Sequence, residues 1–360
     1  MLVLITGITG FLAAHVLDAV LAASPGYRVR GTVRDLKRGQ TILTPLSAAD
    51  RARVELVEVK DGATSDLSDA MRDVDYILHV ASPYQLNVQD PVRDLLTPAI
   101  ETTLNVLRAA KASPSVKKIV LTSSFAAVTN FTKGGPNRPG YTYTVSDWNP
   151  LTYEDAVTSG GRGAVAYSAS KTLAEKAAWD FMQQEAPAFT LSTINPPMIY
   201  GPCRQPVTTK EALNTSSKAI YHLIDSAPKM PEDRLPLFCH VRDVALAHVK
   251  AMEASDDLGG DQRTTQRYLI CGGAFYWCQA VALIAAKYPH LKARLPQGYD
   301  GAIRPDAMKD PSQLARVDTS LAAQKLGLKT YHGWESTLEE SLTDLLRLED
   351  LWLAAAQHKL

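Results

Sequence analysis

A tyrosine and a lysine stand four residues apart in the stretch Tyr167-Ser168-Ala169-Ser170-Lys171. The residues that follow favour a helix, so the two side chains are expected on one helical face. An ammonium beside a phenol favours the phenolate and lowers the pKa of the tyrosine. Such a phenol can give a proton to a carbonyl oxygen while a hydride arrives at the carbon. Tyr167 and Lys171 are therefore the candidate catalytic pair.

This spacing is not specific by itself, because a chain with 14 tyrosines is expected to contain it by chance. A second match occurs at Tyr288 and Lys292. There Pro289 follows the tyrosine directly and interrupts a helix. We interpret the second match as structural and keep the first.

Three hydroxyl residues, Thr122-Ser123-Ser124, follow a predicted strand upstream of the pair. Open α/β sheets bind their ligands at the carboxyl ends of such strands. A hydroxyl there could hold a substrate oxygen and orient Tyr167. The ordinary alternative is a hydroxyl that only satisfies backbone groups at a strand end, and spacing does not choose among the three.

The chain opens on a glycine turn, Thr6-Gly7-Ile8-Thr9-Gly10-Phe11-Leu12-Ala13, between a predicted strand and a predicted helix. Glycines at this spacing allow a tight turn and a close backbone approach to a pyrophosphate. The helix start supplies free amides and a favourable dipole for the anion. The sequence predicts a dinucleotide site, with an ordinary tight loop as the alternative.

The end of the second predicted strand distinguishes NADP from NAD. An acid there accepts from the ribose hydroxyl of NAD, whereas arginine suits the 2′-phosphate of NADP. The strand ends in Val33-Arg34, and Lys37 and Arg38 follow. A planar guanidinium can stack on adenine and pair with the phosphate. We predict NADP(H), although Asp35 could instead serve NAD.

Short apolar runs alternate with helical patterns over the first two-thirds of the chain, which predicts an α/β fold with a doubly wound parallel sheet of the Rossmann type. The predicted strands are Leu2–Thr6, Arg28–Val33, Val54–Val59, Tyr76–Val80, Lys118–Thr122, Thr190–Ile194 and Arg267–Cys271. The predicted helices include Phe11–Ala23, Thr97–Ala112, Tyr167–Gln184, His240–Ala254 and Leu338–Ala356.

Prolines and glycines break the pattern after Asn195. We therefore predict a nucleotide-binding domain over residues 1–196, to which residues 237–273 return. Residues 197–236 and 274–360 are predicted to form a smaller, mostly helical substrate lobe and a lid.

The composition excludes several classes of protein. The chain has 360 residues, 38 basic and 38 acidic, and no long block of one sign. This balance favours neither a nucleic acid nor a membrane as partner. The four cysteines form no CxxC pair and no cluster with histidine, so we expect no metal site, and reduced thiols in a cytoplasmic protein.

Neither terminus is read as a targeting signal. Leu2–Ile5 already reads as a strand, which leaves no room for a signal peptide. The last residues, His358-Lys359-Leu360, loosely resemble a peroxisomal address, but a frayed surface terminus is the preferred interpretation.

Together these motifs resemble the extended short-chain dehydrogenase/reductases over almost the whole chain. Within them the chain is most similar to the fungal carbonyl reductases of the methylglyoxal/3-methylbutanal type, and more distantly to plant dihydroflavonol 4-reductases. The Asn-Trp-Tyr-Cys-Tyr-Gly-Lys signature of plant cinnamoyl-CoA reductases is absent, which argues against a CoA thioester as substrate.

The resemblance assigns further roles. It selects Ser124 as the catalytic serine beside Tyr167 and Lys171, and Asn105 as the supporting asparagine of the active-site relay. It implies transfer of the 4-pro-S hydride. Together with the glycine turn, it places the following residues, besides Tyr167 and Lys171, at the cofactor: Thr6, Gly7, Thr9, Gly10, Phe11, Leu12, Arg34, Lys37, Asp61, Gly62, Val80, Ala81, Ser82, Pro196 and Met198.

The expected activity is the reduction of an aldehyde or ketone to an alcohol. Candidate apolar walls of the substrate pocket are Tyr84, Phe125, Met198 and Phe238, each of which could equally be plain core. The partner is then a small carbonyl compound, and the chain acts as a monomer or homodimer. Alternatives on this scaffold are a dihydroflavonol- or steroid-type dehydrogenase, a sugar-nucleotide epimerase, and an NADP-sensing regulator without catalysis.

Overall fold

The computed structural model describes residues 1–84, 88–160, 163–255, 266–297 and 313–357. Within these ranges seven strands form one parallel sheet, in the order β10-β7-β5-β4-β1-β2-β3. The strands are β1 (Leu2–Ile5), β2 (Arg28–Val33), β3 (Val54–Glu58), β4 (Tyr76–His79), β5 (Lys118–Thr122), β7 (Thr190–Asn195) and β10 (Gln266–Leu269). The predicted parallel sheet is confirmed, and each strand lies within two residues of its predicted bounds.

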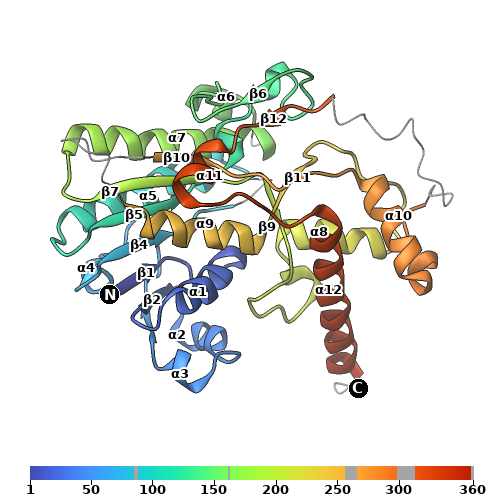
Figure 1. The fold of residues 1–360 in the computed structure, drawn as a ribbon, viewed down its shortest axis with the longest axis horizontal. Coiled ribbons are helices and arrows are strands. Elements are labelled where there is room, and N and C mark those ends of the chain that lie inside the picture. The colour runs from blue at the N-terminus through green and yellow to red at the C-terminus, as the bar shows by residue number, and fades with distance from the viewer. Residues whose placement is uncertain (85–87, 161–162, 256–265, 298–312, 358–360) are drawn as a thin grey trace.

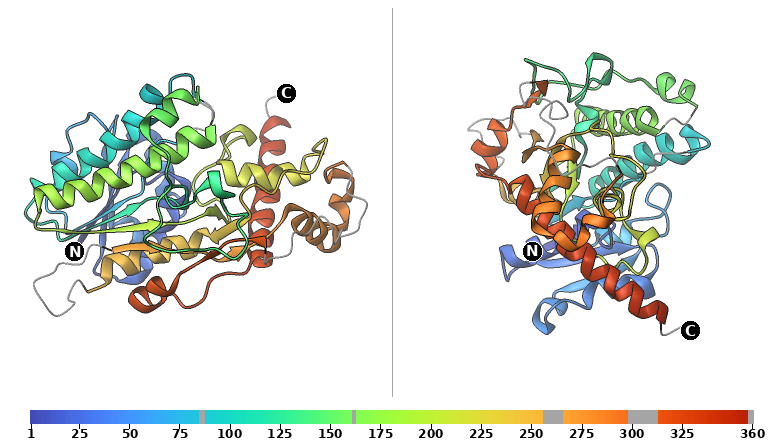
Figure 2. Two further views of the ribbon diagram at one scale, coloured as in Figure 1. Left: turned by 90° about the horizontal axis from the view of Figure 1, so that it is seen from above. Right: turned by 90° about the vertical axis from the view of Figure 1, so that its right-hand side faces the viewer.

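Helices cover both faces of this sheet (Figures 1 and 2). One face carries α1 (Phe11–Ala23), α9 (Val241–Glu253) and α11 (Ser320–Leu326), and the other carries α4 (Ser68–Met71), α5 (Thr97–Lys111) and α7 (Gly163–Glu185). Successive side chains of a strand point to opposite faces. In β1, Val3 and Ile5 therefore join the α1 and α9 core, while Leu4 joins the α5 and α7 core.

A smaller lobe lies beside the sheet and has a core of its own (Figure 1). Its strands are β8 (Met198–Tyr200), β9 (Leu237–His240) and β11 (Gly273–Ala274), in which β8 runs parallel and β11 antiparallel to β9. Its main helices are α8 (Thr215–Tyr221), α10 (Trp277–Lys287) and α12 (Trp334–Gln357). The predicted, mostly helical C-terminal region is confirmed.

Shorter elements lie between these helices and strands. They are α2 (Leu36–Gly39), α3 (Ala48–Arg51), α6 (Tyr153–Thr158), β6 (Thr142–Tyr143) and β12 (Arg316–Val317), with single helical turns at Gln40–Leu43, Val92–Leu96, Phe125–Ala127, Phe131–Lys133, Lys210–Ala212, His222–Ile224 and Pro289–Arg294. β12 pairs in parallel with β6 and so ties the late part of the chain to the loop that follows β5.

The long helix α12 is amphipathic. Its buried residues Leu338, Leu342, Leu345 and Leu348 recur every three or four positions, as expected for one apolar stripe. Arg347, Glu349 and Asp350 interrupt the apolar character on the other faces. Neither α12 nor any other helix in the described part of the chain is long and apolar enough to cross a membrane.

The two parts interleave more than the predicted boundaries allow. α11 lies in the stretch predicted for the lobe, yet it packs on α9 and β10, and its Ala322 and Leu326 are buried in the core of the large sheet. β9 lies in the stretch predicted to return to the large domain, yet it pairs with β8. The reason is alternation along β9, which buries Phe238 in the lobe core and Cys239 in the core beneath α9.

We predict that Phe238→Ala destabilises the fold. The side chain is 1% exposed and packs edge-on against Phe275, with ring centroids 5.5 Å apart. Removing a buried phenyl ring costs about 3–5 kcal/mol, because transfer and cavity terms add. Chemical denaturation of the purified chain measures this loss. Leu246→Ala on α9 is the control, since Leu246 is 41% exposed, and an equal loss in both variants would contradict the prediction.

Candidate active site

The glycine turn after β1 is held by the threonine that precedes it. Oγ1 of Thr6 accepts from the backbone N–H groups of Val80 and Ala81, both at 3.0 Å. The same oxygen lies 2.8 Å from Nδ1 of His79, so its own hydrogen points to that nitrogen. Burial lowers the pKa of His79 to about 3, which keeps the ring neutral. Thr6 thus joins the end of β1 to the end of β4.

Gly7 adopts a backbone conformation that favours glycine. Its φ is +64°, and a Cβ atom there would lie 3.0 Å from the Cβ of Ala81. Its N–H donates to Oγ1 of Thr32 at 2.9 Å, and Gly10 N–H donates back to the Gly7 carbonyl at 2.8 Å. α1 then begins at Phe11 without a side-chain cap, so its first amides remain available to an anion.

A cavity of about 1800 Å³ runs from this turn along the carboxyl ends of the sheet strands. Most of the predicted site residues line it, from both the cofactor and the catalytic sets. These are Thr6, Gly7, Thr9, Gly10, Phe11, Leu12, Arg34, Asp61, Gly62, Val80, Ala81, Ser82, Tyr84, Ser124, Phe125, Tyr167, Lys171, Pro196 and Met198. Such a position, outside the ends of parallel strands, is where open α/β sheets bind ligands.

The basic residues after β2 separate in the structure. Arg34 is exposed and lines the cavity beside the glycine turn. Asp35 instead caps α2, because its carboxylate accepts from the N–H of Arg38 at 2.8 Å. Lys37 lies on α2, exposed and outside the cavity lining. Its role at the cofactor stays a prediction.

Asn105 supports the loop at Asp61-Gly62. Its amide nitrogen donates to the carbonyls of Gly62 and Ser65, at 2.9 and 3.0 Å, and it does not line the cavity. Asp61 closes the same loop by accepting from the N–H groups of Ala63 and Thr64. The part of Asn105 in a relay at Tyr167 stays a prediction.

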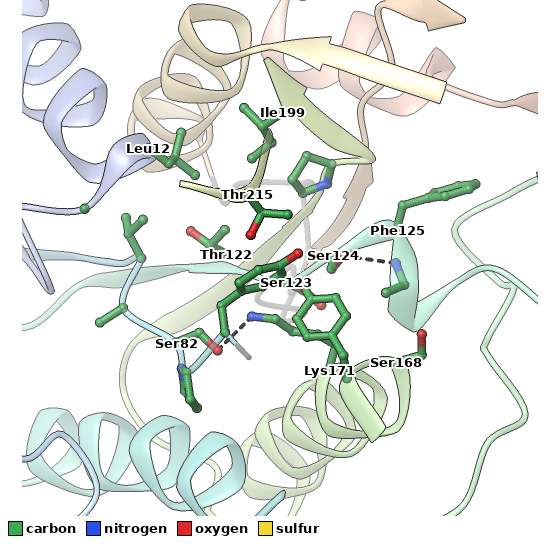
Figure 3. Close-up of a pocket in the computed structure, with 18 of the residues that line it drawn as sticks. Leu12, Ser82, Thr122, Ser123, Ser124, Phe125, Ser168, Lys171, Ile199 and Thr215 are labelled. Atoms are coloured by element: carbon green, nitrogen blue, oxygen red, sulfur yellow. Dashed lines mark hydrogen bonds between the residues drawn. The ribbon is translucent and has the colours of Figure 1, made fainter. Parts of the chain in front are cut away.

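α7 brings the candidate pair to the cavity (Figure 3). Nζ of Lys171 donates to the hydroxyl of Ser82 at 2.7 Å and lies 5.8 Å from the ring centroid of Tyr167. The hydroxyl of Ser124 accepts from the N–H of Ala126 at 3.0 Å and lies near enough to the phenol of Tyr167 to oppose the rise of its pKa. Ser124 comes from the end of β5 and Ser82 from the end of β4, so two strand ends and one helix form the set.

The structure gives different partners to Thr122, Ser123 and Ser124, the three hydroxyl residues among which sequence spacing could not choose. Thr122 donates to Nε2 of His248 on α9 at 2.6 Å, since Nδ1 of that ring is bonded to the Val244 carbonyl. Ser123 is buried and donates to the carboxylate of Glu175 at 2.5 Å. Of the three, Ser124 is the one whose contact acts on the pKa of the Tyr167 phenol. Ser124 lies beyond the end of β5, where it caps the turn at Phe125–Ala127.

Burial dominates the electrostatics of the set. It raises the pKa of Tyr167 above its usual value, and the hydrogen bond from Ser124 opposes that rise. Burial also lowers the pKa of Lys171 to about 8, while the negative charge of Glu175 opposes that fall. Near neutral pH the phenol therefore holds its proton, and the lysine is mostly an ammonium.

Aromatic and polar groups form the walls beside Tyr167. The ring of Tyr84 stands edge-on to Tyr167, with centroids 5.0 Å apart, and Tyr84 and Thr215 of α8 both line the cavity. Phe125 and Met198 also line the cavity, whereas Phe238 does not. Phe238 is corrected to a core residue, because on β9 it points into the lobe.

Several lining residues escaped the sequence analysis. Thr32, which accepts from Gly7, and Thr215, which faces the cavity from α8, are examples (Figure 3). Asn149 is another, and its amide donates to the Ala126 carbonyl at 2.8 Å. Thr32 could have been found from its place at the end of β2, but no local pattern marks Thr215 or Asn149. Among the described residues, no group of three or more His, Cys, Asp or Glu side chains could hold a metal ion.

Comparison with known proteins gives the family. The NAD dependent epimerase/dehydratase family profile matches residues 3–265. The chain is 36% identical over 354 residues to the ketoreductase azaE of Aspergillus niger, covering 96% of this chain and 97% of that one. It is 29% identical over 362 residues to the NADPH-dependent methylglyoxal reductase GRE2 of Saccharomyces cerevisiae, covering 97% and 99%.

The solved structures agree. Gre2 of Candida albicans in complex with NADPH superposes with a TM-score of 0.79 at 31% identity, covering 97% of this chain and 99% of that one. The resemblance to the extended short-chain dehydrogenase/reductases is thereby confirmed. By the profile match over most of its length, the chain belongs to the NAD dependent epimerase/dehydratase family.

Proposed function

We propose that the chain reduces an aldehyde or ketone to an alcohol with NADPH. The observation that carries this proposal is the convergence of Ser124, Tyr167 and Lys171 in the cavity that begins at the glycine turn. The names of the relatives, an NADPH-dependent methylglyoxal reductase and a ketoreductase, support the same reaction class.

The cavity fits a phosphorylated dinucleotide. The uncapped start of α1 and the tight turn at Gly7 form a cradle for a pyrophosphate. Arg34 offers a planar cation on the cavity wall, and Asp35 is occupied as the cap of α2. This arrangement supports NADP(H) over NAD and disfavours an epimerase that retains NAD.

In the proposed reaction, bound NADPH supplies the hydride. Ser124 holds the carbonyl oxygen of the substrate, and Tyr167 gives its proton to that oxygen. Lys171 stabilises the resulting phenolate through its ammonium charge. Lys171 would also bind a ribose hydroxyl of the cofactor in place of its bond to Ser82. Tyr84, Phe125 and Met198 would contact the rest of the substrate.

The proposal extends to the setting of the enzyme. Cys203, Cys239 and Cys271 are free thiols, which supports a cytoplasmic location. A small carbonyl compound is the expected partner, with the chain acting as a monomer or homodimer. An NADP-sensing regulator has no need of the Ser124, Tyr167 and Lys171 set, which favours an enzyme.

Tyr167→Phe is expected to abolish turnover and to leave NADPH binding nearly intact. The variant lacks only the proton donor, and general acid–base help of this kind is worth about 10²–10⁴-fold. The loss of NADPH absorbance with a panel of aldehydes and ketones measures turnover, and NADPH fluorescence measures binding. Parental turnover in this variant would contradict the assignment.

Arg34→Leu is expected to weaken NADPH binding by about tenfold or more and to leave NADH binding unchanged, because a charged hydrogen bond to the 2′-phosphate is worth about 1.5–3 kcal/mol. Lys37→Leu is the matched control, since it removes the same charge three residues away and outside the cavity wall. Equal losses in both variants would show that only overall charge matters.

Turnover is expected to fall as the pH rises through about 8. The folded pKa of Lys171 lies near that value, so the ammonium is present below it and is lost above it. The pH profile of kcat measures the fall. A profile that stays flat to pH 10 would show that the charge of Lys171 is not needed.

A further inference from the structure

An ion pair lies buried behind the wall of the cavity. Glu175 stands on α7 one turn beyond Lys171 and is fully buried, and Arg267 comes from β10 with 8% of its side chain exposed. Nε of Arg267 donates to Oε1 of Glu175 at 2.7 Å. Neither residue is part of the cavity lining, and neither has a role in the proposed proton transfer.

The carboxylate of Glu175 binds the ends of two strands. Oε2 accepts from the hydroxyl of Ser123 on β5 and from the amide of Asn195 on β7, at 2.5 and 2.7 Å. The same amide nitrogen also donates to the carbonyl of Ser124 at 3.3 Å. Oε1 accepts from Thr193 in addition to Arg267. Glu175 is therefore linked to Ser124 twice, through the preceding hydroxyl and through one amide.

Arg267 holds the segment that follows Ser124. Nη2 donates to the carbonyl of Ala127 at 3.3 Å, and Nη1 donates to the carbonyls of Val145 and Asp147. The guanidinium also lies 3.9 Å from the ring centroid of Trp148. The planar fork thus binds a carboxylate and three carbonyls at once, which lysine could not do.

The Glu175–Arg267 pair also contributes to the electrostatic environment of the Lys171 ammonium. In the described part of the chain, His79 from β4 and Tyr167 and Glu175 from α7 face this ammonium, and Arg267 is paired with Glu175. His79 is neutral because burial lowers its pKa to about 3. Glu175 is therefore the negative charge near the ammonium, and Arg267 is the counterion that permits that charge to be buried.

We propose that Glu175 and Arg267 are a positioning pair, which holds the backbone of Ser124 against α7 and keeps a negative charge one turn from Lys171. This inference rests on the proposed function. It goes beyond that function because neither residue touches the cavity. The pair acts through Ser124 and Lys171 and leaves the cofactor cradle alone.

Glu175→Gln is expected to lower kcat about tenfold and to change the KM for NADPH by less than about threefold. Without the anion, the neighbouring guanidinium is uncompensated, so the pKa of Lys171 falls further. The basic limb of the kcat profile then moves to lower pH by about one unit. The double variant Glu175→Gln/Arg267→Met removes both charges, so its limb should lie between those of the parent and the single variant.

Glu349→Gln is the matched control. Glu349 forms a comparable pair with Arg294 in the lobe, with contacts of 2.6 and 2.8 Å, away from the cavity lining. Loss of the Glu349 carboxylate should lower the stability of the fold and leave the basic limb of the kcat pH profile at the same pH as in the parent. A purely structural role for Glu175 predicts the same pattern for Glu175→Gln, and that result would overturn the proposal.

A second readout does not depend on turnover. The pH dependence of acetylation of Lys171 by acetic anhydride, followed by mass spectrometry, reports the pKa of this amine directly. It should fall in Glu175→Gln and stay unchanged in Glu349→Gln. If the unsubstituted chain reduces no carbonyl compound, only the proposed function is refuted. The acetylation of Lys171 would still test the role of the Glu175–Arg267 pair. If Glu175→Gln does not fold, Glu175→Gln/Arg267→Met is tested instead. A kcat pH profile and a Lys171 acetylation curve equal to those of the parent would then refute the proposed role of the Glu175–Arg267 pair.

Discussion

Parallel pairing of β4, β5 and β7 brings three strand ends to one edge of the sheet, and the chemistry of the molecule depends on that edge. Ser82 follows β4, Ser124 follows β5, and Asn195 ends β7. α7 crosses nearby with Tyr167 and Lys171. A shift of one residue in either pairing would displace these strand ends relative to one another and turn the side chains of the shifted strand to opposite faces.

The same edge concentrates polar groups in an apolar surrounding. His79, Glu175, Arg267 and Lys171 are each less than a tenth exposed. Buried polar groups are tolerated when they are hydrogen bonded, and here each has a named partner. The consequence is a site whose donors are fixed before any ligand arrives, which is what electrostatic stabilisation of a developing charge requires.

The features that depend on local spacing could be predicted from the sequence. The glycine turn and the pair at Tyr167 and Lys171 each lie within a few residues, and helix and strand periodicity fixes their geometry. The strands of the sheet followed from their apolar runs, which are typical of strands covered on both faces. The comparisons confirm the predicted fold of the chain, and its relatives include a ketoreductase and a methylglyoxal reductase.

The features that depend on tertiary direction could not be predicted. Asn105 donates to two loop carbonyls, Lys37 lies on α2 outside the cavity lining, and Phe238 packs in the core of the lobe. In each case the residue type suited the predicted role, but its direction was set by contacts with distant parts of the chain. The network of Glu175 has the same origin, since its partners lie on three strands far apart in sequence.

β9 carries a mechanical consequence. Phe238 is packed in the core of the lobe and the next residue, Cys239, in the core beneath α9. A strand anchored in two close-packed interiors cannot rotate without opening one of them. Any rotation of the lobe about β9 would therefore disturb the packing of Phe238 or of Cys239, and this strand opposes a hinge between the lobe and the sheet.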